Sequence, residues 1–295
     1  MTTRAYPDVY ELKTMLMLRR EIDEKMGEAA SLGFFQRKRK AALERETVEL
    51  EQKMKKSRQR ILDLNYPYDH PIMLAARDMD AIPYGRLTDE ESAGGSPILW
   101  QLIDIIDTEA LFLSRHALFA TTFHSFFEDV TYKDSSVREI LNDYCYTNWF
   151  DSGEKERIIR VPVWTDETSD RMNPHASTQD YLFLLSEKEV VGKLGPGRLS
   201  CQGVDLLSKG ARGAEANVCW WLRTPGKICD HRMYVTPKGI VDVDGACVDM
   251  TRRGKGALAS DVDFDVYVRP AMFVQLVDDY IYYARQWQYQ RQGSY

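Results

Sequence analysis

Long apolar runs are missing from the sequence. No window of the 295 residues approaches the roughly 20 consecutive apolar residues that a membrane-spanning helix needs. The first residues, MTTRAYPDVYELK, also lack the apolar stretch of a secretory signal. The sequence therefore predicts no membrane insertion and synthesis in the cytoplasm, and it leaves association with a virion open.

Cysteine is scarce, and its arrangement is irregular. The five cysteines form no CxxC pair, and no histidine lies at zinc-finger distance from them. This pattern indicates neither a disulfide framework nor a structural zinc site. Because free cysteine is among the most buried residue types, we expect reduced and mostly buried side chains. These residues are Cys145, Cys201, Cys219, Cys229 and Cys247.

Metal ligands in a recognisable series are also missing. Asp242, Asp244 and Asp249 invite a calcium interpretation, but they lack the full ligand series of an EF-hand loop. The pair Asp244-Gly245 is instead typical of a hairpin turn. We therefore expect no bound metal and no cofactor.

Neither basic nor acidic residues dominate the chain, but the two kinds are unevenly distributed along it. The net charge is -6, from 39 Lys and Arg against 45 Asp and Glu. Residues 1–64 carry 15 basic and 11 acidic side chains, whereas residues 65–295 carry 24 and 34. The 44% of hydrophobic residues can fill a sizeable core. We interpret the chain as two segments of different character, joined near residue 65.

Residues 1–64 are predicted to be helical, because proline is absent after Pro7 and good helix formers dominate. Residues 31–33 interrupt the pattern, so the segment predicts two helices, in a hairpin or a bent coiled coil. Two stripes have heptad spacing, and such narrow stripes are typical of helices covered by a partner helix. We expect a homo-oligomer, and whether the partner helix belongs to another copy or to the same chain stays open. The stripes are Leu12, Met15, Ile22, Met26 and Ala29, then Leu43, Thr47, Leu50, Met54, Ser57, Ile61 and Leu64.

The basic run Gln36-Arg37-Lys38-Arg39-Lys40 lies between these stripes. Clustered Lys and Arg can neutralise phosphates. No aromatic side chains interleave the run for base stacking, and the whole chain is acidic. We interpret the run as a solvated helix face and do not expect nucleic acid as a partner.

From residue 66 onward, short strands alternate with short helices and turns. Ser136 and Ser186 are predicted helix caps, since each has a Glu three residues later. This mixture predicts an α+β fold. The expected strands cover 98–106, 110–114, 181–185, 233–236, 240–243 and 246–248, with turns at 107–108, 237–239 and 244–245, and helices over 137–144, 152–158 and from 186.

Six local motifs occur in a fixed order between about residues 80 and 275. They are SPILW (96–100), ALFLSR (110–115), SVREILN (136–142), YLFLLS (181–186), WWLRTP (220–225) and VRPAM (268–272). This ordered set resembles a bacterial and phage family of domains of unknown function, which looks related to C-type-lectin-like and formylglycine-generating-enzyme-like folds. The resemblance implies a C-type-lectin-like binding domain over residues 65–275.

The same resemblance implies that the WWLR and VRPA segments are structural and that loops between them meet the ligand. Some proteins of this fold are the variable receptor-binding products of diversity-generating retroelements. The two segments contain Trp220, Trp221, Arg223 and Arg269. Burial of both tryptophans in the core, and pairing of both arginines with Asp or Glu inside the domain, are the favoured interpretations for these four residues.

Ligand contacts are predicted in the turn-rich region between Gly203 and Arg253, because loops on a rigid scaffold usually carry binding. Trp221 and Arg223 join this set in spite of the structural alternative above. The predicted ligand-binding residues are Lys209, Arg212, Trp221, Arg223, Lys227, His231, Arg252 and Arg253.

Residues 276–295 lie beyond the resemblance. Leu276, Tyr280, Tyr283 and Trp287 recur at steps of four, three and four residues, which predicts an aromatic face on a C-terminal helix or tail. The expected contact of this face is with its own chain or with a neighbouring subunit.

Catalysis is not expected from the sequence. His124, His175 and His231 are isolated, and no carboxylate or nucleophile accompanies them in a recognisable pattern. Two function classes remain. The first is a lectin-like head on a helical stalk that binds a protein or glycan, as a phage or retroelement receptor-binding protein. The alternative is an intracellular scaffold or assembly protein whose head docks a protein partner.

Overall fold

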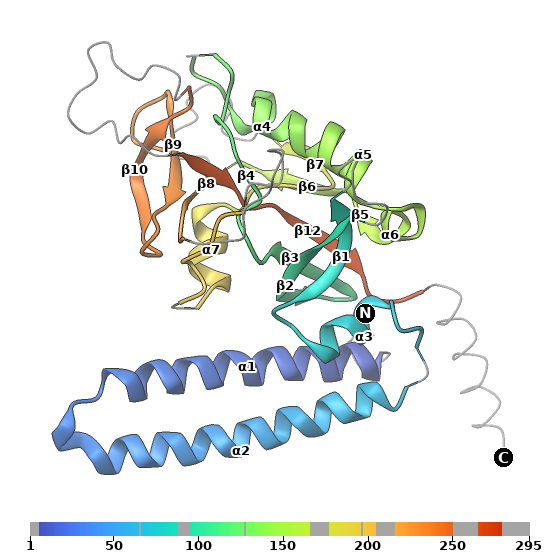
Figure 1. Ribbon diagram of the computed structural model, residues 1–295, viewed down its shortest axis with the longest axis vertical. Coiled ribbons are helices and arrows are strands. Elements are labelled where there is room, and N and C mark those ends of the chain that lie inside the picture. The colour runs from blue at the N-terminus through green and yellow to red at the C-terminus, as the bar shows by residue number, and fades with distance from the viewer. Residues whose placement is uncertain are drawn as a thin grey trace.

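The computed structural model describes residues 6–64, 66–87, 95–126, 128–165, 177–195, 197–204, 216–249 and 265–278. It shows N-terminal helices followed by a mixed, β-rich domain, which we call the head (Figure 1). Within these ranges, no helix is both long and apolar enough to cross a bilayer.

The N-terminal segment is an antiparallel hairpin of α1 (Pro7–Ser31) and α2 (Arg37–Leu62), joined through the 3-10 turn η2 (Phe34–Gln36) (Figure 1). The predicted stripes are buried against each other along the hairpin, with Leu43 and Leu50 among the buried residues of α2. The partner helix left open by the sequence is thus supplied by the same chain. Met26 departs from the expected stripe, because 56% of it is exposed.

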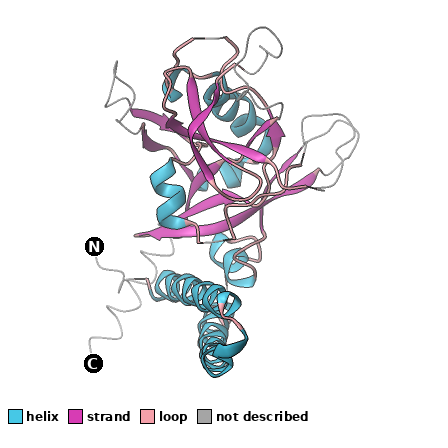
Figure 2. Ribbon diagram, turned by 90° about the vertical axis from the view of Figure 1, so that its left-hand side faces the viewer, coloured by secondary structure: helices cyan, strands magenta, loops and turns pink. Residues whose placement is uncertain are grey.

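The open end of the hairpin belongs to the apolar core of the head. Leu12, Met15 and Ile61 are fully buried and fall in one continuous cluster with the strands of the head. The short helix α3 (Pro71–Arg77) contacts both α1 and α2. Figure 2 shows the hairpin below the strands, with α3 between them. The boundary predicted at residue 64 lies close to the end of the hairpin, but the hairpin and the head share one apolar core.

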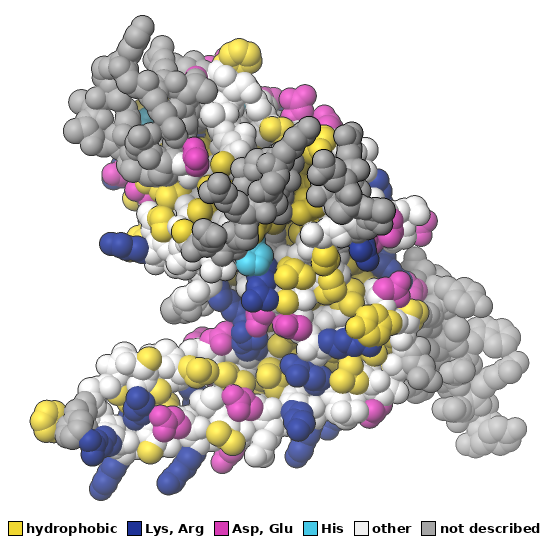
Figure 3. Space-filling view, in the orientation of Figure 1, with side chains coloured by type: hydrophobic (Ala, Val, Ile, Leu, Met, Phe, Trp, Pro, Cys, Tyr) yellow, Lys and Arg dark blue, Asp and Glu magenta, His cyan; other side chains and the backbone are white. Residues whose placement is uncertain are grey.

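An ion-pair network also fastens the hairpin to the head. Arg19 of α1 lies 2.5 Å from Asp80. Arg198 lies 3.2 Å from Asp80 and 3.3 Å from Asp23 of α1. Lys193 pairs with Asp104 beside them. Figure 3 shows charged side chains of both signs where the hairpin meets the head. Because the network is only partly exposed, it orients the hairpin more than an isolated surface pair would.

The first sheet has the order β1-β2-β3-β12-β5, and its strands are β1 (Ile82–Leu87), β2 (Ser96–Ile106), β3 (Glu109–Ser114), β12 (Ala271–Gln275) and β5 (Ile158–Ile159). The predicted hairpin over 98–114 is confirmed, with Ile106 opposite Glu109. Asp107 in its turn has φ 51°, a conformation that Asp tolerates better than most residues.

The second sheet has the order β10-β9-β8-β11-β4, and its strands are β10 (Val241–Cys247), β9 (His231–Val235), β8 (Cys219–Pro225), β11 (Val266–Val268) and β4 (Phe119–Ala120). Every residue of β8 is buried, including Trp220 and Trp221. The favoured interpretation that both tryptophans lie in the core is confirmed.

The predicted turn at Asp244-Gly245 is wrong. Strand β10 continues through it, and its register with β9 shifts between Asp242 and Ala246. Gly245 has φ 84°, which allows this irregularity within the strand. The predicted turn at 237–239 is confirmed: it joins β9 to β10, and Gly239 in it has φ 76°.

We expect Gly245→Ala to lower the free energy of unfolding by about 1–3 kcal/mol, because the added Cβ requires a strained backbone at positive φ. That Cβ would also lie 2.7 Å from the carbonyl oxygen of Arg232. Gly27→Ala in α1 is the matched control, since nothing lies within 4 Å of its added Cβ. It should raise the stability by about 0.5–1 kcal/mol. Urea unfolding measures both, and equal effects would contradict the assignment of strain.

The rest of the head contains a two-stranded sheet of β6 (Val161–Trp164) and β7 (Ser177–Asp180) and a helical run. That run passes from η3 (Tyr132–Asp134) through α4 (Ser136–Glu139), the π-helix η4 (Ile140–Cys145) and α5 (Tyr146–Trp149) to α6 (Ser152–Arg157). The cap of α4 is Ser135 and not Ser136 as predicted, because the Ser135 Oγ accepts from the backbone of Arg138.

Two further predictions for this part of the chain have opposite outcomes. Helix α7 (Glu187–Lys193) has the predicted capping box of Ser186 and Glu189. The predicted strand over 181–185 is wrong, since only Phe183 makes a bridge, to Ala271. Its residues Leu182 to Leu185 are nonetheless buried, which explains why an apolar run there resembles a strand.

Asp278, the last described residue, lies beside His70, which is the N-cap of α3. Asp278 lies 3.6 Å from the Nε2 of His70 and 2.5 Å from Arg157. Burial, and then the charge of Arg157, lower the pKa of His70 to about 4, so the ring is neutral at pH 7. Leu276 is buried directly after the end of β12. Tyr280, Tyr283 and Trp287 lie outside the described residues, so the aromatic face of a C-terminal helix stays a prediction.

Candidate functional site

Four of the eight predicted ligand-binding residues are described by the structure, and these four do not form one site. Lys209, Arg212, Arg252 and Arg253 lie outside the described residues. Lys227 and His231 are near the surface, where Lys227 pairs with Asp244 and His231 with the neighbouring Asp230 at 2.8 Å. Trp221 and Arg223 lie in the interior.

The assignment of Trp221 and Arg223 as ligand contacts is corrected by their burial. The Trp221 Nε1 donates to the carbonyl oxygen of Thr121 at 2.9 Å. The Arg223 Nη1 lies 2.5 Å from Glu189 and 2.6 Å from the carbonyl oxygen of Leu184. The guanidinium thus ties α7 to β8, and the favoured interpretation of an internal carboxylate partner is confirmed for Arg223. Arg269, in contrast, binds carbonyl and amide oxygens in place of a carboxylate.

The cysteines follow the expectation of burial in most cases. Cys145, Cys201 and Cys219 are buried, and all five are free. Burial raises the pKa of the Cys145 thiol, which keeps it protonated and unreactive. Cys229 is the exposed member. Across the described ranges, no three His, Cys, Asp or Glu side chains are grouped so as to hold a metal ion.

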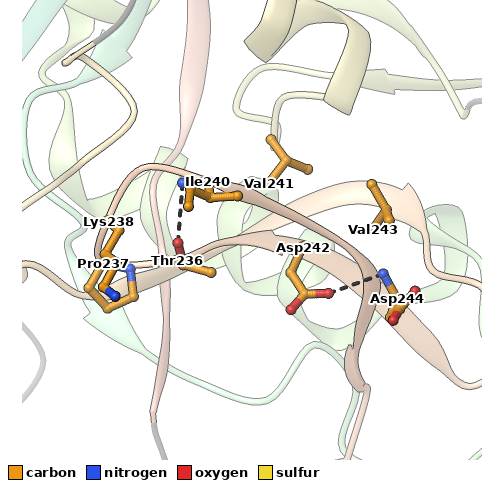
Figure 4. Close-up of a pocket in the computed structure, with 8 residues that line it drawn as sticks. All are labelled: Thr236, Pro237, Lys238, Ile240, Val241, Asp242, Val243 and Asp244. Carbon is orange, nitrogen blue, oxygen red and sulfur yellow. Dashed lines mark hydrogen bonds between the residues drawn. The ribbon is translucent and has the colours of Figure 1, made fainter.

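One hollow, of about 510 Å³, lies along the β9–β10 hairpin inside the predicted ligand region (Figure 4). Val241 and Val243 point to one side of the hairpin, away from Asp242 (Figure 4). Asp242 is engaged within the protein, because it accepts from Tyr234 at 3.0 Å and from the backbone of Asp244 at 3.1 Å. Among the residues that the structure describes, a single hairpin lines this hollow, and no second described element closes around a ligand there.

A second, more polar pocket of about 300 Å³ is assembled from separate segments of the head. Helix α4, the π-helix η4, the segment between β5 and β6, and the strand β7 with the residue after it each contribute to it. Its side chains offer both hydrogen-bond donors and acceptors. The lining residues are Arg138, Glu139, Asn142, Asp143, Arg160, Gln179 and Tyr181.

The π-helix shapes this pocket through Asn142. The Nδ2 of Asn142 donates to the carbonyl oxygens of Arg138 and Leu182 at 3.1 and 2.9 Å. Its Oδ1 accepts from the backbone of Tyr181 at 2.8 Å. One amide side chain therefore fixes the segment after β7 against the helical run. Short π-helical segments are rare and occur frequently at functional sites.

Two arginines supply the positive charge of the pocket. Arg138 forms a two-point contact with Asp180, at 2.7 and 2.8 Å, and Asp180 is fully buried. Burial alone would lower the pKa of Arg138, but the hydrogen bond and charge of Asp180 raise it. Arg160 donates to the carbonyl oxygen of Gln179 at 3.1 Å, and its guanidinium lies 5.7 Å from the ring centre of Tyr181.

An aromatic pair supports one wall. The rings of Tyr146 and Tyr181 stack at 3.9 Å with an angle of 4° between them. This stacking connects α5 to the segment after β7 and holds Tyr181 beside Arg160. The pocket walls are therefore positioned by contacts within the protein and need no ligand for their arrangement.

Sequence reasoning missed this pocket, because its residues lie outside the loops between Gly203 and Arg253. The four-residue spacing of Arg138 and Asn142 was the only local signal, since it places both on one side of a helix. Their meeting with Gln179 and Tyr181 depends on the packing of β7 against the helical run.

A comparison with protein families finds a match that covers most of the head. The family described as Domain of unknown function (DUF6273) matches residues 108–276, more than half of the chain. The chain belongs to this family. No curated protein and no solved structure matches it. The match covers β3 to β12, and so it includes both the polar pocket and the β9–β10 hairpin.

Proposed function

We propose that this member of the family is a ligand-binding protein whose head recognises a glycan in the polar pocket lined by Arg138, Arg160 and Tyr181. The observation that carries the proposal is the pocket itself, about 300 Å³ in volume and built from several segments around a π-helix. Ligand sites are typically concave and largely preformed, with a few placed polar groups.

The lining chemistry favours a glycan over a protein surface. A sugar presents hydroxyl groups that donate and accept hydrogen bonds, and the pocket pairs arginine donors with the carboxylates of Glu139 and Asp143. The core of a protein interface is depleted of charged residues. Here four of the seven lining side chains are charged. This composition supports a small polar ligand.

The C-type-lectin-like fold belongs to the same proposal. Its support is the ordered set of motifs, from SPILW to VRPAM, and the mixed sheet architecture that contains them. In this proposal the head is a phage or retroelement receptor-binding module, and the hairpin of α1 and α2 is its stalk.

We also propose that the stalk self-associates as a coiled coil, through apolar side chains other than the heptad stripes. The heptad stripes are already covered within the hairpin, so they no longer call for a second copy. Exposed apolar side chains remain on the outside of the hairpin, among them Met17 at 62%, Met26 at 56% and Val48 at 50%. In this proposal these side chains form one apolar patch, and contiguous patches of this kind mark interaction surfaces.

We expect Arg160→Ala to weaken glycan binding at least tenfold, because a charge-assisted hydrogen bond contributes about 1.5–3 kcal/mol. The full-length protein is first screened on a glycan array, and the best ligand is then titrated calorimetrically. Asp143→Asn tests an acceptor of the same pocket in the same way.

Lys238→Ala is the matched control, since Lys238 lines the β9–β10 hollow and not the pocket. Its affinity should equal that of the unmodified protein, and the melting temperature should be similar in all variants. Binding that survives at Arg160→Ala and is lost at Lys238→Ala would place the ligand on the hairpin. Absence of any glycan on the array would refute the proposal and favour a scaffold that docks a protein.

A further inference from the structure

His124, which the sequence leaves isolated, has a serine and a carboxylate on its two ring nitrogens. The Nδ1 of His124 lies 3.1 Å from the Oγ of Ser136. Its Nε2 lies 2.9 Å from the Oε1 of Glu128. A nucleophile, a base and a third group that orients the base are the parts of an activated serine. None of these residues lines the polar pocket.

The neighbours of His124 determine which nitrogen carries the proton. The backbone N–H of Ser136 can only donate, and it points at Nδ1 from 3.2 Å. A carboxylate can only accept, and Glu128 faces Nε2. The neutral ring therefore carries its proton on Nε2, and Nδ1 has its lone pair toward Ser136. This is the tautomer in which His124 can take the proton of the Ser136 hydroxyl.

The Oγ of Ser136 is held in place by Ser125. The backbone N–H of Ser125 donates to this Oγ at 3.1 Å, and the Ser125 hydroxyl lies 3.0 Å away. These two contacts fix the Oγ beside Nδ1, which keeps the hydroxyl within hydrogen-bond reach of the base.

Backbone contacts hold the three parts in place. The N–H of His124 donates to the carbonyl oxygen of Val248 at 3.1 Å, and the N–H of Val137 donates to that of Phe123 at 3.2 Å. The segment carrying the base is thus bonded both to the end of β10 and to the start of α4. Such support keeps a catalytic geometry without help from a substrate.

The described residues of the site differ in their exposure. The ring of His124 is largely covered, whereas 60% of the Glu128 side chain is exposed. Ser136 is partly exposed, and Ser125 lies at the surface. Phe126 is 68% exposed and meets His124 edge to face at 5.8 Å between ring centres. An exposed aromatic ring beside a base offers an apolar contact for an acyl or aryl group.

We propose that Ser136, His124 and Glu128 form a serine hydrolase site for small acyl esters. The Ser136 Oγ attacks the ester carbonyl carbon while its proton passes to the Nδ1 of His124. The bond to the alcohol oxygen breaks, and that oxygen takes the proton from Nδ1 and leaves as the alcohol. Water then attacks the acyl-serine with Nδ1 as base, the acid is released, and the hydroxyl of Ser136 is restored. Glu128 is a positioning residue that holds the ring.

The test is covalent labelling of the full-length protein with a fluorophosphonate probe, followed by intact and peptide mass measurement. We expect one probe per chain, attached at Ser136, and hydrolysis of p-nitrophenyl acetate. Ser136→Ala should remove both signals. His124→Gln should slow labelling at least about a hundredfold, since a general base contributes about 10²–10⁴-fold.

Two variants separate catalysis from a structural role. Glu128→Gln should slow labelling less than His124→Gln does, and it should lower kcat for p-nitrophenyl acetate more than it changes KM, because the ring loses the carboxylate that orients it while the base itself remains. Ser152→Ala, at the exposed start of α6, is the control and should label as the unmodified protein does.

Two outcomes would overturn the proposal: an unlabelled protein, or equal labelling of Ser136→Ala. The three side chains would then have only a structural role, in which His124 binds the start of α4. Because this site shares no residue with the pocket, its failure would leave glycan binding untouched.

Discussion

Replacing Arg269 with methionine should lower the free energy of unfolding by about 3–5 kcal/mol. The side chain is 1% exposed and links three separate segments. Its Nε donates to the carbonyl oxygen of Ser114 at 3.0 Å, Nη1 to that of Arg198 at 3.1 Å, and Nη2 to the Oε1 of Gln101 at 3.1 Å. Each acceptor left without its donor in the interior costs about 1–3 kcal/mol. Methionine fills a similar volume, so the loss comes from the polar contacts.

Arg115→Met provides the comparison for Arg269→Met, because Arg115 is exposed and close in the sequence to Ser114. Its effect should stay within about 0.5 kcal/mol, as for most surface substitutions. Urea unfolding followed by tryptophan fluorescence measures both variants, and Trp220 lies 4.9 Å from the Arg269 guanidinium as a local reporter. Similar midpoints for the two variants would show that Arg269 is not a structural residue of the head.

Met15→Ala should destabilise the protein by about 2–5 kcal/mol, the range for removing a large apolar side chain from a core. Met15 is fully buried where α1 meets the head. Because hairpin and head share this cluster, we expect a single unfolding transition that shifts as a whole.

Met26→Ala uses the same helix and the same chemical change at a position that is 56% exposed. Its stability should change by less than about 0.5 kcal/mol. Thermal unfolding compares the pair. Two separate transitions in Met15→Ala, with that of the head unchanged, would show that the hairpin is an independent unit and would contradict the shared core.

The sequence by itself determined the local elements whose signals lie within a few residues. Helix formers and heptad spacing predicted the two N-terminal helices, and the capping box of Ser186 and Glu189 predicted the start of α7. The strands around Asp107 were predicted because alternating apolar runs flank a two-residue turn. In each case the contacts that decide the structure are close in the chain.

Only the tertiary structure decided the features that depend on distant partners. The local sequence Asp244-Gly245 predicted a turn, but β10 continues past Gly245 because it pairs with β9. The apolar residues 181–185 were predicted as a strand, yet burial without a ladder satisfies the same pattern. Trp221 was a candidate ligand contact until packing placed it in the core.

The sites show the same division. Ser136 was predicted as a helix cap and His124 as an isolated side chain, and their contact arises because residues 123 and 137 are joined through the backbone. Asn142 and Tyr181 are 39 residues apart and meet through a side-chain hydrogen bond. Residue types and short-range geometry are written in the sequence, because they depend on neighbours three or four positions away. The grouping of chemistry from separate segments is decided by the folding of the core, since burial of apolar area is nondirectional and does not reveal its partners in advance.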